Sequence, residues 1–216
     1  MKKNLMFIIA SLIVLCSCVV PANNLHDFDA GKQISVQPDK KQEKYSSHDE
    51  TLSKEEKVPY KHDVYKSVAE IRANHKEGTD FRIKYMLRKS SVAVFAIHGG
   101  KLEQGTSAIA KAVAGKDYSF YLFEVLLKNP HRLHITAANF DDPAALEIAE
   151  SSIFGLSMHV EKEKGDMICV GSGNLDAAKM MSDMLISEGY PVEYPCKRLP
   201  GKSPKNIVNR TKLGGV

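Results

Sequence analysis

The feature that most constrains the fold is a nearly continuous apolar run at residues 91–97, Ser-Val-Ala-Val-Phe-Ala-Ile. The run is rich in β-branched residues and ends abruptly at His98, Gly99 and Gly100. A strand without alternating polar residues is typical of a sheet that is covered on both faces. The run therefore predicts a central strand that is buried on both sides.

Helical and strand patterns alternate through the rest of the chain after residue 61. One helix is predicted from about residue 64 to a point before Gly78. Others are predicted over 106–114, from 141 or 142 to 151, and over 175–187. Thr106 or Ser107 is the predicted cap of the second helix. Strands are predicted over 81–85, 118–125, 133–138, 155–160, 167–170 and 192–194. This alternation predicts an α/β fold, with three layers (α/β/α) and a mixed sheet.

The first residues are typical of an export signal. Lys2 and Lys3 precede an apolar stretch, 5–15, which is too short to span a bilayer comfortably. The following Leu15-Cys16-Ser17-Cys18 resembles the lipobox of bacterial lipoproteins. We therefore expect a lipoprotein signal peptide at 1–17 and a lipidated Cys18. The alternative is an ordinary signal peptide, or an uncleaved anchor, with incidental cysteines.

Residues 18–60 are polar, with few large apolar side chains and no sustained periodicity. Such a segment buries too little surface to order itself, which predicts a disordered tether. The expected domain is then 61–216. We expect a protein of the cell envelope that is attached to the membrane through Cys18. Val19 favours the outer membrane if the cell has two membranes.

Charge indicates the kind of partner. The formal net charge of +4 and the pI near 8.7 favour anionic partners. No basic run interleaved with aromatic residues and no zinc-knuckle spacing is present, so we expect no nucleic-acid binding.

Two cysteines, Cys169 and Cys196, lie in the predicted domain. An oxidising compartment permits a disulfide between them, and two buried free thiols on different strands are the alternative. Neither belongs to a Cys-x-x-Cys pair, so we do not expect them to bind a metal.

The end of the buried strand carries the residues most suited to chemistry. His98 follows the strand directly, and Glu103 comes five residues later, just before the predicted helix. Gly99 and Gly100 allow a tight turn, so the imidazole and the carboxylate can converge. A zinc site with an open position needs three protein ligands, commonly His and a carboxylate. His159, at the end of another predicted strand, is the candidate third ligand. Alternatively, His98 is a hydrogen-bonded structural residue and Glu103 favours a helix N-terminus.

Residues 91–107 resemble the signature of the phage-type poly-γ-glutamate hydrolases. The similarity continues, in the same order, in 117–124, 133–141, 157–159 and 206–210. The resemblance implies a carboxypeptidase/phosphorylase-hydrolase-like fold with Zn²⁺ as its cofactor. It implies His98, Glu103 and His159 as zinc ligands. It also implies Arg210 as a catalytic residue that holds a substrate carboxylate or the developing oxyanion. Alternatively, Arg210 is one more cation of a basic tail.

The chain departs from the family pattern at three positions near this site. Val160 and Lys101 stand where the family usually has Gly, and Gln104 stands where it usually has Pro. In the family, a segment like 213–216 leads into a final strand whose Glu is expected to act as general base. The sequence ends at Val216, so we expect a domain without that strand.

Two functions follow from these expectations. The first is zinc-dependent hydrolysis of γ-glutamyl linkages, in poly-γ-glutamate or a related γ-linked peptide, impaired by the missing Glu. The second is a catalytically degenerate envelope lipoprotein that keeps the fold and the zinc site as a binding or structural module. The sequence does not decide whether the protein is an enzyme.

Overall fold

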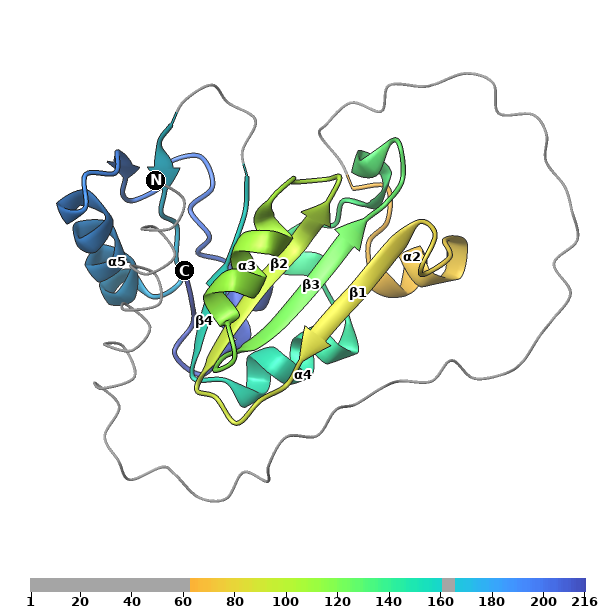
Figure 1. Ribbon diagram of the computed structural model, residues 1–216, viewed down its shortest axis with the longest axis horizontal. Coiled ribbons are helices and arrows are strands. Elements are labelled where there is room, and N and C mark those ends of the chain that lie inside the picture. Colours follow the sequence, from red (N-terminus) through yellow and green to blue (C-terminus); the bar gives the residue numbers. More distant parts are fainter. Residues whose placement is uncertain (1–62, 161–165) are drawn as a thin grey trace, which may run out of the picture.

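A computed structural model describes residues 63–160 and 166–216 (Figure 1). The predicted signal peptide, the predicted tether and Cys18 lie outside the described residues. Among the described helices, none has both the length and the apolarity that a membrane span requires.

A four-stranded mixed sheet forms the centre of the domain, in the order β1-β3-β2-β4. Its strands are β1 (Phe81–Met86), β2 (Val92–Gly100), β3 (Ser119–Val125) and β4 (Phe154–Ser157). β1 is antiparallel to β3, whereas β2 is parallel to both β3 and β4. The predicted central strand is therefore confirmed, since β2 lies between two strands and is buried from Val92 to Gly99.

Helices cover both faces of this sheet (Figure 1). Successive side chains of a strand point to opposite faces, and the two apolar cores follow this period. Val94 of β2 packs in one core with α3 (Thr106–Ala114) and α5 (Leu175–Ser187). Phe95 packs in the other core with α2 (Val68–Asn74) and α4 (Pro143–Ser151). The three-layer α/β/α arrangement with a mixed sheet is thus confirmed.

The predicted start of α4 is also confirmed. Asp142 is its N-cap and accepts hydrogen bonds from the backbone N–H groups of Ala144 and Ala145, and Pro143 is the first helical residue. Asp142 is buried, and its other carboxylate oxygen pairs with Arg72 of α2 at 2.9 Å. This ion pair joins the two helices on the same face of the sheet.

The strand predicted over 133–138 is wrong. Two 3-10 helices, Pro130–Leu133 and Ala137–Asn139, overlap the two ends of this segment, and residues 134–136 between them belong to no strand. Leu133 and Ile135 are buried, which explains the apolar alternation in the sequence. The Ile135 carbonyl, however, accepts a hydrogen bond from a side chain, His98 Nε2, rather than from a neighbouring strand. The apolar pattern therefore reflected the burial of these side chains and not hydrogen bonding between strands.

The C-terminal third adds a second small sheet, formed by β5 (Ile168–Cys169) and β6 (Val192–Glu193). Both strands are shorter than predicted. Cys169 and Cys196 form a disulfide bond, which decides between the two alternatives left open by the sequence. The chain then continues through a 3-10 helix, Ile207–Arg210. Near its end, Gly215 forms a parallel bridge with Gly155 of β4.

Candidate metal centre

An irregularity in β2 sets the position of His98. Ala96 pairs with Leu122 of β3, and Gly99 pairs with Glu124, so β2 has one residue more than β3 between these pairs. A bulge of this kind bends a strand and re-aims its side chains. His98 lies in the bulge and is only 5% exposed.

The turn after β2 returns Glu103 to His98. Gly100 has a φ of 70°, and a Cβ atom there would lie 2.4 Å from the Val125 carbonyl oxygen, so only glycine fits. The Glu103 N–H donates to the His98 carbonyl, which closes the turn at 2.8 Å. Thr106, the first residue of α3, donates its hydroxyl to the Glu103 carbonyl. The predicted capping role of Thr106 or Ser107 is wrong, because the N-cap is Gly105 and no side chain caps the helix.

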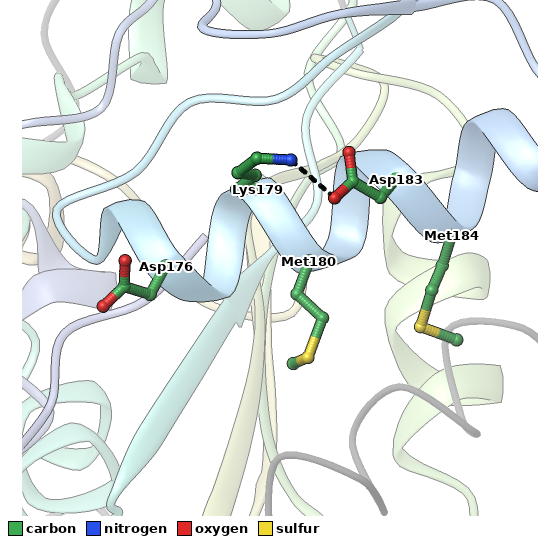
Figure 2. Close-up of a pocket in the computed structure, with 5 residues that line it drawn as sticks. All are labelled: Asp176, Lys179, Met180, Asp183 and Met184. Carbon is green, nitrogen blue, oxygen red and sulfur yellow. Dashed lines mark hydrogen bonds and ion pairs between the residues drawn. The ribbon is translucent and has the colours of Figure 1, made fainter.

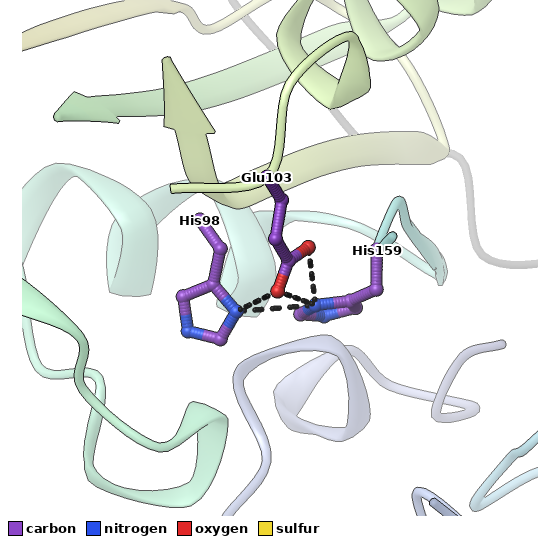
Figure 3. A group of neighbouring side chains, drawn as sticks. All are labelled: His98, Glu103 and His159. Carbon is purple, nitrogen blue, oxygen red and sulfur yellow. Dashed lines mark hydrogen bonds and ion pairs between the residues drawn. The ribbon is translucent and has the colours of Figure 1, made fainter. Parts of the chain in front are cut away.

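His159 completes a cluster of three side chains, as Figure 3 shows. β4 runs parallel to β2, with Ser157 paired to Phe95, so the two strands end at the same edge of the sheet. The Nδ1 atoms of His98 and His159 lie 3.2 Å apart. Glu103 Oε1 lies 2.9 Å from the first and 3.5 Å from the second. The structure therefore brings together the three residues that were predicted as metal ligands.

A backbone carbonyl determines which nitrogen of His98 faces the cluster. His98 Nε2 lies 2.8 Å from the Ile135 carbonyl oxygen, which can only accept a hydrogen bond. The proton of the neutral ring is therefore on Nε2, and Nδ1 directs a lone pair toward Glu103. Two acceptors 2.9 Å apart repel each other unless a proton or a metal cation lies between them. A metal-binding histidine usually donates its other ring N–H to a carboxylate, a water molecule or, as here, a backbone carbonyl.

The second carboxylate oxygen of Glu103 has its own partner. Glu103 Oε2 accepts a hydrogen bond from the Val160 N–H at 2.9 Å and also lies 3.3 Å from His159 Nδ1, so this backbone bond orients the carboxylate with both oxygens near His159. Burial raises the pKa of Glu103, but His159 and His98, when a proton on their Nδ1 atoms faces the carboxylate, outweigh it and lower the pKa to about 2. The carboxylate is thus ionised at neutral pH and can act as a metal ligand.

The donor set fits zinc. Zinc binds imidazole nitrogen and carboxylate oxygen at about 2.0–2.2 Å, so ligand atoms of a tetrahedral site lie about 3.3 Å apart. The three separations between His98 Nδ1, Glu103 Oε1 and His159 Nδ1 are 2.9, 3.2 and 3.5 Å, which bracket this value. His159 is the most exposed of the three, with 35% of its side chain accessible, so an ion held here would have a side open to solvent.

Arg210 lies outside this cluster. It ends the 3-10 helix that packs against β4 and α4, and it is half-buried. Its Nε donates to the Lys205 carbonyl at 3.2 Å. In the described part of the chain, no hydrogen bond or ion pair joins Arg210 to His98, Glu103 or His159. Its role in catalysis stays a prediction.

Two neighbours of the cluster were not recognised from the sequence. The His134 ring packs against the His98 ring with centroids 4.4 Å apart and the planes tilted by 31°, and His134 Nδ1 lies 2.7 Å from Asp63 Oδ1. Burial lowers the pKa of His134, and the nearby His98 lowers it further. The alternation around His134 in the sequence left its direction open, and no pattern pointed to Asp63.

Two other features of the structure are weaker candidates for a functional site than the cluster of His98, Glu103 and His159. A shallow pocket lies along α5, lined by Asp176, Lys179, Met180, Asp183 and Met184 (Figure 2). It contains none of the three clustered residues. Cys169 and Cys196 lie close to Glu193, but their sulfurs are joined in a disulfide and offer no thiolate to a metal.

Comparison with known proteins identifies the family. Residues 65–216 match the family described as poly-gamma-glutamate hydrolase. The chain belongs to the poly-gamma-glutamate hydrolase family. The resemblance inferred from the sequence motifs is therefore confirmed, and the matched residues include His98, Glu103 and His159.

Relatives in Bacillus subtilis (strain 168) support this assignment. The chain is 35% identical to YndL over 158 residues, which cover 72% of this chain and 62% of YndL. It is 30% identical to YmaC over 156 residues, 70% of this chain and 66% of YmaC. The chain thus spans less than two thirds of the length of these relatives.

Two solved structures share the fold. A bacteriophage poly-gamma-glutamate hydrolase superimposes with a TM-score of 0.67 at 28% identity, over 71% of this chain and 76% of that chain. A zinc-free form of YndL superimposes with a TM-score of 0.66 at 35% identity, over the same shares of the two chains.

Proposed function

We propose that this member of the poly-gamma-glutamate hydrolase family is a zinc-dependent hydrolase of γ-glutamyl amide bonds. The observation that carries the proposal is the convergence of His98 Nδ1, Glu103 Oε1 and His159 Nδ1 within 3.5 Å of one another. A phage relative of the same fold is a poly-gamma-glutamate hydrolase, which supports this substrate class.

The residues around the site have distinct tasks in the proposed reaction. Zinc, when bound, would polarise the scissile carbonyl and lower the pKa of a water molecule. The Ile135 carbonyl keeps the proton of His98 on Nε2, so that Nδ1 is free to act as a ligand. The Val160 N–H holds Glu103 Oε2 and so orients the carboxylate toward the two histidines.

Arg210 is the proposed contact for a substrate carboxylate or for the developing oxyanion. A γ-linked glutamyl chain carries a free α-carboxylate on each residue, and a planar guanidinium binds carboxylates with two hydrogen bonds. The net charge of +4 also favours an anionic polymer. A γ-glutamyl bond in a cell-wall peptide presents the same chemistry.

We also propose that the protein is exported and held at the cell envelope by lipid on Cys18. The charged head, short apolar stretch and Leu15-Cys16-Ser17-Cys18 sequence support this. Metabolic labelling with a fatty acid should label the wild-type protein and not the Cys18→Ser variant. Equal labelling of the two would overturn the proposal.

Metal analysis and a hydrolysis assay test the enzymatic proposal together. The purified domain should contain stoichiometric zinc, and it should cleave poly-γ-glutamate while leaving α-linked polyglutamate intact. His98→Ala should abolish both properties. His75→Ala is the matched control, because His75 bonds Tyr65 and Asp80 instead of a clustered residue.

Two results would contradict the proposal in different ways. A wild-type protein without zinc affinity would overturn the metal site itself. Zinc binding that depends on His98, without cleavage of either polymer, would overturn the hydrolase and leave a zinc-binding module.

A further inference from the structure

Asp63 makes two hydrogen bonds to residues on either side of Ile135. Its Oδ1 lies 2.7 Å from His134 Nδ1, and its Oδ2 accepts the Thr136 N–H at 2.7 Å. One carboxylate thus holds both neighbours of a single residue. Burial raises the pKa of Asp63, but the bonds from Thr136 and His134 lower it below its usual value, so the carboxylate is ionised.

The residue between these two bonds orients the candidate zinc ligand His98. The Ile135 carbonyl accepts the Nε2–H of His98 at 2.8 Å, and both residues are buried. The His134 ring, held by Asp63, lies against the His98 ring with centroids 4.4 Å apart. Asp63 therefore fixes two groups that constrain His98, one at its Nε2 atom and one at its ring face.

Residues 134–136 lie between two 3-10 helices and belong to no strand, so the two bonds of Asp63 add to the backbone bonds at the ends of this segment. A strand would hold the Ile135 carbonyl through ladder bonds, whereas here Asp63 anchors the segment from outside. The family match begins at residue 65, so Asp63 lies outside the matched region.

We propose that Asp63 is a positioning residue for the metal centre, which it serves by holding the Ile135 carbonyl and the His134 ring against His98. The inference rests on the proposed zinc site. By fixing the ring before the metal arrives, Asp63 lowers the entropic cost of bringing three ligand atoms together. Residues that orient a metal ligand typically change metal affinity by about 10–100-fold when they are removed.

Competition with a chromogenic chelator would measure the zinc affinity of the wild type, Asp63→Ala and Asp63→Asn. Asp63→Ala should weaken zinc binding by about 10-fold, the low end of that range, because Asp63 acts through other groups. Asp63→Asn should weaken it less, because the amide oxygen can still accept the Thr136 N–H.

Asp80→Ala is the matched control. Asp80 also holds a histidine and a backbone N–H, at 3.2 Å from His75 Nδ1 and 3.0 Å from Lys76 N. The two alanine variants therefore lose the same kinds of bond. Thermal unfolding of the metal-free proteins should show comparable destabilisation, whereas only Asp63→Ala should lose zinc affinity.

A second experiment measures how fast the proton on His98 Nε2 exchanges with solvent. In proton–nitrogen NMR spectra, the His98 Nε2–H should exchange slowly with solvent in the wild type and faster in Asp63→Asn. Zinc affinity and exchange that are unchanged in both Asp63 variants would overturn the inference, as would an equal loss of affinity in Asp80→Ala. Failure of the wild type to bind zinc would instead overturn the proposed function.

Discussion

His98 Nδ1 and His159 Nδ1 lie 3.2 Å apart although 61 residues separate them in the chain. Their proximity follows from the parallel pairing of β2 with β4, which ends both strands at one edge of the sheet. Ligands of open α/β sheets usually bind at the carboxyl ends of the strands. The cluster therefore lies where the fold is most able to accept a substrate.

Zinc should stabilise the folded domain, because an ion that binds only the native state shifts the unfolding equilibrium. At a free zinc concentration of 100 times Kd, the gain is about 2.7 kcal/mol, or about 5–10 °C in Tm for a domain of this size. Differential scanning calorimetry with and without a chelator would measure it. The same chelator should leave the Tm of His98→Ala unchanged, and an equal shift in that variant would place the ion elsewhere.

Gly100→Ala should destabilise the protein by at least about 2 kcal/mol, because the residue has a positive φ and no room for a side chain. A Cβ atom there would lie 2.4 Å from the Val125 carbonyl oxygen. Gly78→Ala is the control, since Gly78 also has a positive φ, of 88°, but no atom within 4 Å of its Cβ position. Urea unfolding measures both.

The same pair of variants tests the link between the turn and the metal site. Because Gly100 shapes the turn that leads to Glu103, Gly100→Ala should also weaken zinc binding, and Gly78→Ala should not. Equal stability and equal affinity in the two variants would show that the turn tolerates a side chain.

Replacing both Cys169 and Cys196 with serine should destabilise the domain by about 3–4 kcal/mol, the entropic effect of opening a loop of this length. The disulfide closes a loop of 27 residues that includes α5. Chemical denaturation of the two proteins would give the difference. Zinc affinity should stay the same, because neither cysteine belongs to the cluster, and a parallel loss of zinc would show that α5 supports the site.

Glu124→Gln should lower stability at neutral pH and have no effect at strongly acidic pH. Burial raises the pKa of Glu124, but hydrogen bonds from Arg82 and Lys84 outweigh it and lower the pKa. A carboxylate with a lowered folded-state pKa stabilises the protein above its unfolded pKa, and this contribution is lost as the pH falls through the folded value. We expect a loss of roughly 0.5–1 kcal/mol at pH 7.

Denaturation from neutral to acidic pH would test this prediction. Asp183→Asn is the control, because its ion pair with Lys179 is exposed, with 60% of the Asp183 side chain accessible. That variant should match the wild type at every pH. A constant deficit for Glu124→Gln down to acidic pH would mean that packing, and not charge, accounts for its effect.

The central strand, the start of α4 and the proximity of His98 to Glu103 could be predicted from the sequence because each has a local signal. The apolar run that contains Val94 and Phe95 has no polar face, so it could only be a strand covered on both sides. Asp142 and Pro143 form a local signal for a helix start, and the helix begins there. His98 and Glu103 are close in sequence and joined by glycines, so their convergence followed from a short turn.

Long-range partners carried no such signal. The alternating apolar residues Leu133 and Ile135 predicted a strand. The same alternation of buried residues occurs here in a segment without a strand, because the His98 side chain donates a hydrogen bond to the Ile135 carbonyl in place of a neighbouring strand. Asp63 lies in a polar stretch that resembles any solvated segment, and its distance from Thr136 along the chain is 73 residues. Neither contact can be read from neighbouring residues.

The sequence by itself determined the α/β class, the buried central strand, the His98–Glu103 turn and the family. The first three depend on interactions between residues that are close in the chain, or on a period that burial imposes on one element, and the family follows from the order of its motifs along the chain. Only the tertiary structure decided the disulfide, the contact of the His134 ring with the His98 ring, and the hydrogen bonds of Asp63 to His134 and Thr136. These contacts join segments whose separation is set by the packing of helices on the sheet, and packing is a property of all the segments together.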